Sequence, residues 1–178
     1  YTTTIETLMP DGRSIQSGTS HNLGQHFADA FDVTFEDEDA EKQTAYTTSW
    51  GFSTRTMGAI VLAHGDDEGL VLPPNIAPYQ VVIVPIFNED NQEEVLEYAG
   101  EVAEDLEEQF RVKFDDRTHR TPGFKFNEWE LKGVPLRIEI GPNEMEDDEL
   151  TTVRRDNGDK EMGLSMEEAE EIVQDSLE

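Results

Sequence analysis

A polar stretch near the start of the chain combines residue types that bind ligands. Arg13–Gln25, which reads RSIQSGTSHNLGQ, holds amides, hydroxyls, an imidazole and two glycines. Small residues let a ligand approach the backbone closely. On a strand, alternate side chains share one face and could form a pocket floor. The two candidate rows are Gln16, Gly18 and Ser20, or Ser17, Thr19 and His21.

The same stretch fits a simpler interpretation, a turn that ends in a helix N-cap at Asn22. A second stretch, Tyr46–Arg55 (YTTSWGFSTR), has the same unusual mix and also leads into an apolar helical pattern. Its last residue, Arg55, falls in the first turn of that predicted helix, where backbone N–H groups and the helix dipole favour an anion. A guanidinium in that place could bind a phosphate with two hydrogen bonds.

Four motifs together resemble one enzyme family. GTSHNLGQ, SWGFSTR, HGDDEGLVLPP and PGFKFNEWELKGVPLRIEIGP follow one another in this order. They closely resemble the prolyl-tRNA synthetases, in the form typical of archaea and of the eukaryotic cytoplasm, and the resemblance covers nearly the whole chain. It implies a class II aminoacyl-tRNA synthetase that activates proline with ATP and Mg²⁺ and transfers it to tRNA(Pro).

The resemblance also implies roles for single residues of the first part. STR matches the third class II signature motif, which makes Arg55 the catalytic arginine that grips the γ-phosphate of ATP. The other matches are Gln16 and Thr19 as ATP contacts and His21, Trp50 and Gly51 as the wall of the proline pocket. A structural histidine and a core indole are the alternatives at two of these positions. No acid–base pair is required, because the proline carboxylate is itself a nucleophile that the enzyme positions for in-line attack.

Five residues of the second part match positions that face anticodon bases in this family. They are Phe126, Glu130 and Arg137 and, matching less closely, Glu144 and Lys160. An aromatic face can stack a splayed base, an arginine can fork onto guanine O6 and N7, and a carboxylate can accept from guanine amino groups. The alternative is that the phenylalanine and Trp129 are core aromatics and that the arginine forms a salt bridge on a strand.

Some parts of the family pattern are missing from this sequence. The first two class II motifs normally precede this segment, and the chain begins without Met, so we expect a fragment that does not activate proline alone. The cysteine-containing C-terminal extension is also missing, so no zinc is predicted. His64, Asp66 and Asp67 (HGDDEG) could suggest a metal site, but flanking glycines favour a helix end and a turn. A homodimer is expected for the complete enzyme.

The composition is strongly acidic. The chain of 178 residues carries 41 acidic and 13 basic side chains, a formal net charge of −28. Such chains are often disordered, but two Trp, nine Phe and periodic apolar segments favour a folded protein. Concentrated salt screens repulsion between surface carboxylates, so we infer a halophilic source. The absence of cysteine suits the cytoplasm, and no apolar run approaches the roughly 20 residues that span a bilayer.

The apolar patterns predict the elements that position these residues. In the first part we expect strands over Tyr1–Leu8, Arg13–His21, Val33–Phe35 and Tyr46–Trp50, a helix from Asn22 through Phe31, and a helix from Ser53 to Gly65. In the second part we expect strands over Gln80–Ile86, Val112–Phe114, Leu136–Ile140 and Leu150–Arg155, and helices over Asn91–Phe110 and after a capping box of Ser165 and Glu168. Gly123–Lys132 is expected to be a helix or a tight loop.

The expected fold class is α/β (α+β). Residues 1–76 would be the antiparallel-sheet, C-terminal part of a class II catalytic domain, and residues 77–178 a small mixed-sheet α/β anticodon-binding domain. The proline-containing stretch Gly69–Pro78 marks the boundary. The expected function is proline–tRNA ligase. The alternatives are a stand-alone tRNA- or RNA-binding accessory protein without ligase activity and a synthetase for another amino acid.

Overall fold

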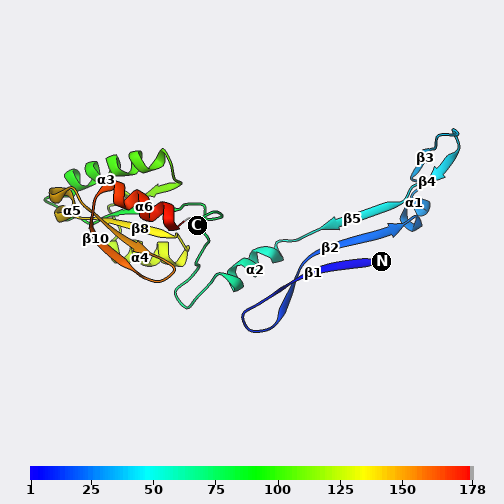
Figure 1. Ribbon diagram of the computed structural model, residues 1–178, viewed down its shortest axis with the longest axis horizontal. Coiled ribbons are helices and arrows are strands. Elements are labelled where there is room, and N and C mark those ends of the chain that lie inside the picture. Colours follow the sequence, from blue (N-terminus) through cyan, green and yellow to red (C-terminus); the bar gives the residue numbers. More distant parts are fainter. Residues whose placement is uncertain (177–178) are drawn as a thin grey trace. The chain divides into compact units, whose positions relative to one another are not determined.

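The computed structural model describes residues 1–176, which form two compact units (Figure 1). The first comprises Tyr1–Ala63 and the second begins at His64. Both combine helices with β-sheet, so the expected α/β (α+β) class is confirmed. Between residues 1 and 176, no helix is both long and apolar enough to cross a membrane.

The first unit is built on an antiparallel sheet with strand order β1-β2-β5 (Figure 1). Its elements are β1 (Thr2–Leu8), β2 (Ser14–Gly24), α1 (His26–Ala30), β3 (Thr34–Glu36), β4 (Lys42–Thr44), β5 (Thr47–Gly51) and α2 (Arg55–Ala63). β-Branched residues in β1 and the turn at Pro10–Gly12 favour the first hairpin, as predicted. The short pair β3–β4 brackets the acidic loop that follows α1.

The helix predicted to begin at Asn22 is wrong. Strand β2 continues to Gly24, and only the five residues of α1 are helical. The backbone N–H of Asn22 donates to the carbonyl of Tyr1 at 2.9 Å, and Gly24 is paired with Thr47. The strand is hydrogen-bonded on both sides here, and these long-range bonds override the local helical spacing of apolar residues.

The first unit buries few apolar side chains. Met9, Ala28 and Ala59 are its buried hydrophobic residues within the described part of the chain. Large apolar side chains on its strands and on α2, including Ile5, are exposed. The sheet therefore holds together mainly through its backbone ladder, and its apolar surface is available for contact.

The second unit is a five-stranded mixed sheet covered by helices (Figure 1). The strand order is β10-β9-β8-β6-β7, with β6 parallel to β7 and β8, and β9 antiparallel to β8 and β10. Its elements are β6 (Val81–Pro85), α3 (Gln92–Glu107), β7 (Val112–Phe114), α4 (Pro122–Leu131), β8 (Leu136–Ile140), α5 (Pro142–Asp147), β9 (Leu150–Arg154), β10 (Lys160–Leu164) and α6 (Met166–Ser176).

The two faces of this sheet are covered unequally. On one face, Val81, Ile83 and Ile138 pack with the buried side of α3 and with Val173 of α6. On the other face, Val82 and Val84 pack beneath Trp129 of α4, leaving a smaller core. All five residues of β6 are buried, which confirms the predicted central strand. Because α4 is the main helix on the second face, part of that face stays open.

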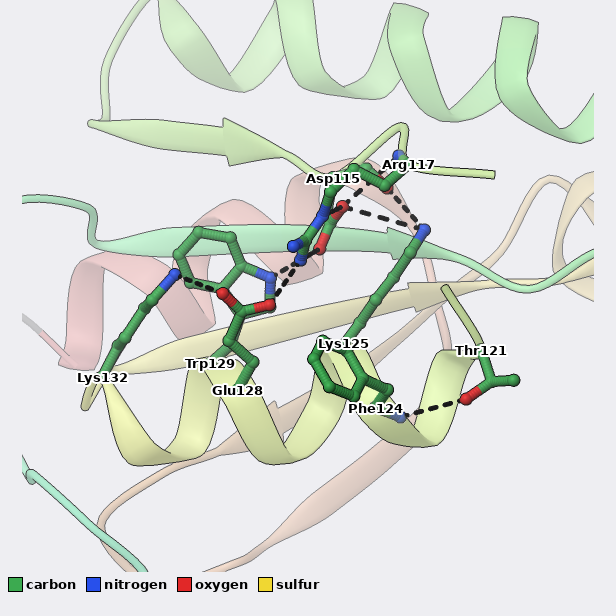
Figure 2. A network of polar contacts seen from close by, with 8 residues as sticks. All are labelled: Asp115, Arg117, Thr121, Phe124, Lys125, Glu128, Trp129 and Lys132. Atoms are coloured by element: carbon green, nitrogen blue, oxygen red, sulfur yellow. Dashed lines mark hydrogen bonds and ion pairs between the residues drawn. The ribbon is translucent and has the colours of Figure 1, made fainter. Parts of the chain in front are cut away.

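A buried carboxylate fastens α4 to the sheet (Figure 2). Asp115, which is 1% exposed, accepts hydrogen bonds from Arg117 Nε at 2.7 Å and from the Trp129 indole N–H at 2.8 Å. The ammonium of Lys125, also 1% exposed, donates to the Asp115 carbonyl at 2.8 Å. Arg117 reaches Glu128 at 2.7 Å on the next turn of α4. Asp115 and Arg117, in the loop after β7, therefore hold two successive turns of the helix, at Lys125 and at Glu128–Trp129.

The ionised form of Asp115 is strongly favoured. Burial alone would raise its pKa, but hydrogen bonds from Arg117 and Trp129 and the charge of Lys125 outweigh burial and lower the pKa to about 2. Burial lowers the pKa of Lys125, and the charge of Asp115 opposes that change. The two groups therefore stabilise each other's charged forms in a place that excludes water.

The segment His64–Ile76 is folded onto the second unit. Asp66 makes two hydrogen bonds with Arg155, at 2.6 and 2.8 Å, and these bonds hold the pKa of its carboxyl well below the usual range. Its Oδ1 also accepts backbone N–H groups of the turn, so the HGDDEG motif forms a turn, as predicted. The backbone N–H of Leu70 donates to Leu131 at 3.2 Å. The two compact units divide between Ala63 and His64, whereas the predicted boundary between the catalytic and anticodon-binding domains, at residues 76 and 77, stays a prediction.

We expect Asp115→Asn to lower the free energy of unfolding by roughly 3 kcal/mol at pH 7, because Lys125 would lose its buried counter-charge. The pKa of Asp115 is lower in the folded protein than in the unfolded chain, so its stabilisation is complete above about pH 4. It is lost as the pH falls through about 2, and at 1.36 kcal/mol per pH unit it amounts to roughly 2 kcal/mol. Urea denaturation between pH 7 and 2 measures both effects.

The control for this prediction is Asp116→Asn, which removes the same charge from the exposed neighbouring residue. It should change the unfolding free energy by less than about 0.5 kcal/mol and leave the acid dependence intact. Equal effects of the two substitutions would show that Asp115 does not anchor α4.

A second prediction concerns salt. The exposed side of α3 carries Glu93, Glu97, Glu101 and Asp105 at intervals of four residues, and each such pair repels by a few tenths of a kcal/mol. Summed over a chain of net charge −28, this repulsion is comparable with the roughly 5–15 kcal/mol stability of a domain. We expect full folding only in molar potassium chloride, which screens repulsion and strengthens apolar burial. Circular dichroism from about 0.1 to 3 M potassium chloride measures this, and full folding at the lowest salt would show that the acidity is unrelated to salt.

Candidate functional site

A hollow of about 340 Å³ in the first unit is lined by both polar stretches of the sequence. The lining includes all six predicted residues of this unit: Gln16, Thr19, His21, Trp50, Gly51 and Arg55. They meet because β2 and β5 are antiparallel neighbours, with Thr19 opposite Gly51 and His21 opposite Ser49. Helix α2 begins at Arg55, after the three residues that follow β5, and Arg55 therefore also lines the hollow. Sequence reasoning did not assign Ser49, Phe52 or Ser53, which also line the hollow.

An irregularity in β2 places Gln16 beside Thr19. The two residues are three positions apart, so a regular strand would put them on opposite faces. The register against β1 shifts at this point, because Ile5 is paired with Gly18 and Glu6 with Gln16, which leaves Ser17 unpaired. A bulge of this kind shifts the alternation by one residue. The predicted separation into two alternating rows is therefore wrong, since members of both rows line one hollow.

Polar contacts hold several of these side chains. Arg55 Nη1 donates to Gln16 Oε1 at 3.3 Å, and the backbone N–H of Arg55 donates to the Ser53 hydroxyl at 3.3 Å. Nδ1 of His21 and the Thr2 hydroxyl are 2.8 Å apart. Trp50 is 77% exposed, so the core-indole alternative is wrong for this residue. Its indole forms an apolar part of the hollow's lining instead.

The donor types around this hollow suit an anion more than a metal ion. The lining holds hydroxyls, an amide, an imidazole and a guanidinium, and no carboxylate. Mg²⁺ prefers carboxylate and other hard oxygen ligands. Across residues 1–176, no group of three or more His, Cys, Asp or Glu side chains could hold a metal ion. The residues present fit the phosphates of a nucleotide and supply no set of protein ligands for Mg²⁺.

A second cluster of polar residues lies on the open sheet face of the second unit. Arg137 and Glu139 are two positions apart on β8 and share this face, on which Val153 of β9 lies opposite Arg137 and Lys160 of β10 lies opposite Val153. Glu130 reaches the same place from α4. A hollow of about 590 Å³ is lined by Glu130 and Arg137, among others. Four strand positions and one helix therefore converge on one surface.

Arg137 is the centre of this cluster. Its Nη1 donates to Glu130 Oε1 at 2.7 Å, its Nε donates to Glu139 Oε1 at 2.9 Å, and its guanidinium lies 4.3 Å from the centre of the Phe126 ring. The salt-bridge alternative for this arginine thus describes the contacts seen. Nη2 of Arg137 and Oε2 of Glu130 have no hydrogen-bond partner within residues 1–176, which leaves one donor and one acceptor for a ligand.

The other two predicted residues of this unit, Lys160 and Glu144, have different hydrogen-bond partners. Lys160 Nζ donates to Glu139 Oε2 at 2.7 Å, which joins it to the Arg137 cluster. Glu144 Oε2 accepts the backbone N–H of Gly141 at 3.0 Å, and its Oε1 accepts the Thr151 hydroxyl at 3.2 Å. Glu144 therefore fixes the start of α5, although Thr151, opposite Glu139, brings it to the same sheet face.

Two residues with important contacts were not found from the sequence. The sequence indicates Trp129 only as a core aromatic, and it is indeed buried, but its indole N–H also donates to Asp115. Glu139, at 6% exposure, bridges Arg137 and Lys160. A charge at every second position of LRIEI was the available signal, because Arg137 and Glu139 must then share one face of a buried strand.

The sequence is similar to those of several curated proteins from other organisms. The chain is 64% identical to a proline–tRNA ligase of Halobacterium salinarum over 159 residues, which are 89% of this chain and 32% of that protein. It is 58% identical to that of Natronomonas pharaonis over 177 residues, 99% of this chain and 36% of the relative. For Haloarcula marismortui the identity is 60% over 161 residues, 90% and 33% of the two chains.

The chain thus spans about a third of the length of the curated relatives it matches. These three relatives come from halophilic archaea, which agrees with the halophilic source inferred from the acidity. Residues 80–176 match the family described as "Anticodon binding domain". This match takes in more than half of the chain and nearly all of the five-stranded unit, and on it we conclude that the chain belongs to the anticodon-binding domain family.

Proposed function

We propose that this chain is the part of a cytoplasmic proline–tRNA ligase that carries the third class II motif and the anticodon-binding domain. The observation that carries the proposal is the meeting of two distant stretches in one hollow, with Gln16, Thr19 and Arg55 for ATP and His21, Trp50 and Gly51 for proline. High identity to proline–tRNA ligases over nearly the whole chain supports it. The complete protein, with tRNA(Pro) as its RNA substrate, would act as a homodimer.

In this proposal, the first unit binds and orients the reactants. The guanidinium of Arg55 offsets charge on the γ-phosphate of ATP, and its bond to Gln16 Oε1 keeps it turned toward the hollow. The exposed indole of Trp50 and the small Gly51 shape an apolar wall for the proline ring. The proline carboxylate then attacks the α-phosphate in line, and positioning supplies much of the rate. Mg²⁺, bound through the phosphates of ATP, would contribute further charge compensation.

The open face of the second unit would read the anticodon. Glu130 Oε2 can accept from a guanine amino group, and Nη2 of Arg137 can donate to a guanine acceptor. Nη1 and Nε of Arg137 bond to Glu130 and Glu139. These two bonds fix the orientation of the guanidinium and therefore the direction of Nη2. The half-buried Phe126 ring packs against the core beneath α4 and lies 4.3 Å from the Arg137 guanidinium, and its exposed part would stack a splayed base. Lys160 and Glu144 complete this surface.

A stand-alone RNA-binding protein would use the same surface of the second unit. It is favoured by the separate core of that unit, in contrast with the few buried apolar residues of the first. Proline-dependent exchange of pyrophosphate into ATP separates the two functions, because an accessory protein would bind RNA without this activity.

We expect Arg55→Ala, made in the complete protein, to slow proline-dependent ATP–pyrophosphate exchange by about 100- to 1000-fold, the scale for losing one preorganised charge contact. The matched control is Arg13→Ala, which removes the same charge from an exposed turn of the same unit. An exchange rate for Arg55→Ala within a few-fold of the parent would place this arginine outside the reaction, and loss of exchange in the control would indicate general electrostatics.

Arg137→Ala should weaken tRNA charging by about 1–3 kcal/mol while sparing exchange, because base reading and proline activation lie in different units. Since the substitution also removes a partner of buried Glu139, Arg137→Lys serves as a second variant that keeps a positive charge there. We expect Arg137→Lys to fold normally and still discriminate poorly between anticodons. Equal losses of exchange and charging in both variants would instead indicate a folding role.

A further inference from the structure

Two cations of the second unit bond to neither a carboxylate nor a backbone oxygen of the described residues, in a molecule dominated by carboxylates. Of its Lys and Arg residues within the described part of the chain, eight bond to carboxylates or backbone oxygens, as Arg111 does with Pro74 and Ala77. The exceptions are Lys113 on β7 and Arg120 in the loop before α4. With 41 acidic against 13 basic side chains, an unpaired exposed arginine is unusual.

Arg120 is held in place through the face of its guanidinium. The group lies 4.4 Å from the centre of the Phe124 ring, and the backbone N–H of Phe124 is bound by the Thr121 hydroxyl at 3.4 Å (Figure 2 shows this cap). Stacking uses the flat face of a guanidinium and leaves its N–H edges free. Arg120 makes no hydrogen bond within residues 1–176. Its edges therefore present donors in the fork geometry that matches a phosphate.

The surroundings of Arg120 also favour an anion. A hollow of about 280 Å³ is lined by Pro85, Phe87, Thr118, His119, Arg120 and Thr121, with no carboxylate among its lining residues. Three other hollows of the second unit each include at least one carboxylate: Asp66 in one, Glu101 in another and Asp156 in a third. In a chain of net charge −28, this hollow is a local exception that does not repel a polyanion.

The hollow also lies next to the proposed anticodon surface. Pro85, at the end of β6, is paired with Ile140 at the end of β8, directly after Glu139. Gly141, which follows, is bonded to Glu144. An RNA strand whose bases lie on the Arg137 face can thus continue past the ends of β6 and β8 toward Arg120.

We propose that Arg120, supported by the hydroxyls of Thr118 and Thr121, binds a backbone phosphate of the RNA beside the bases that the open face reads. The inference rests on the proposed function and adds a contact that reads no base. Phosphate contacts set the position and strength of binding, whereas base contacts set the sequence preference. The two kinds of contact respond differently to salt and to base changes, and this difference makes the proposal testable.

The test uses the whole chain and a 17-nucleotide anticodon stem-loop of tRNA(Pro), at potassium chloride concentrations where circular dichroism shows every variant folded. We expect Arg120→Ala to weaken binding about 3- to 10-fold. We also expect it to reduce the slope of log K against log salt by about 0.7, the value for one contact to a single strand. The preference for this stem-loop over one with a changed anticodon base should stay the same.

Two further variants serve as controls for Arg120→Ala. Arg13→Ala removes the same charge elsewhere and should leave affinity and slope unchanged, and Arg137→Lys should reduce the base preference. Unchanged affinity and slope for Arg120→Ala, equal effects of Arg13→Ala, or a loss of base preference in Arg120→Ala would each overturn the inference. If polyglutamate of similar charge displaces the RNA in the parent and not in Arg120→Ala, the surface serves an acidic protein partner and the inference is wrong.

The outcome also separates this inference from the proposed function. If the parent chain prefers the cognate stem-loop and Arg120→Ala binds as the parent does, only the phosphate contact is wrong. If the parent shows no preference for the cognate stem-loop, the proposed anticodon surface fails, and the inference fails with it.

Discussion

The buried carboxylate of Asp115 is the interaction on which the second unit's candidate surface depends. It lies where the chain leaves β7, and it is hydrogen-bonded by Arg117 and Trp129 and paired at 3.8 Å with the ammonium of Lys125. Two of these partners belong to α4, so the helix cannot rotate or slide without leaving a buried charge unpaired. Helix α4 also carries Phe126 and Glu130. The precision of the open face therefore comes from a charge network on the neighbouring residues of the same helix.

Acidity imposes a second constraint on this molecule. Most cations of the second unit form ion pairs with carboxylates. Arg137, for example, pairs with Glu130 and Glu139, and these two bonds fix its orientation. A surface that binds RNA must then rely on a few well-placed donors rather than on a broad basic patch. Specific contacts keep their strength in concentrated salt better than long-range attraction does, because screening acts most on distant charges.

Much of the architecture could be predicted from the sequence, and the failures have identifiable causes. The run around Val81–Pro85 and the periodicity of α3 predicted the buried strand and its crossover helix, because periodicity and burial are local properties. The sequence does not indicate that β2 runs on to Gly24, since the pairing of Gly24 with Thr47 and the hydrogen bond from Asn22 to Tyr1 are non-local. The bulge at Ser17 leaves no clear pattern in one sequence. The ion pair of Asp66 with Arg155 joins residues 89 positions apart, which local spacing cannot indicate.

The stretch Gly69–Pro78, with its prolines, has the composition of a linker, yet much of it is bound to the second unit. A side chain at Gly69 would come within 2.4 Å of Leu131 Cα, so backbone touches backbone there, and the N–H of Leu72 donates to the carbonyl of Gly133 at 3.4 Å. Proteases cut exposed, unpaired backbone, and this segment offers little of it. A chain shortened to begin at residue 77 would lose Asp66 and leave the guanidinium of Arg155, 6% exposed, without its counter-charge.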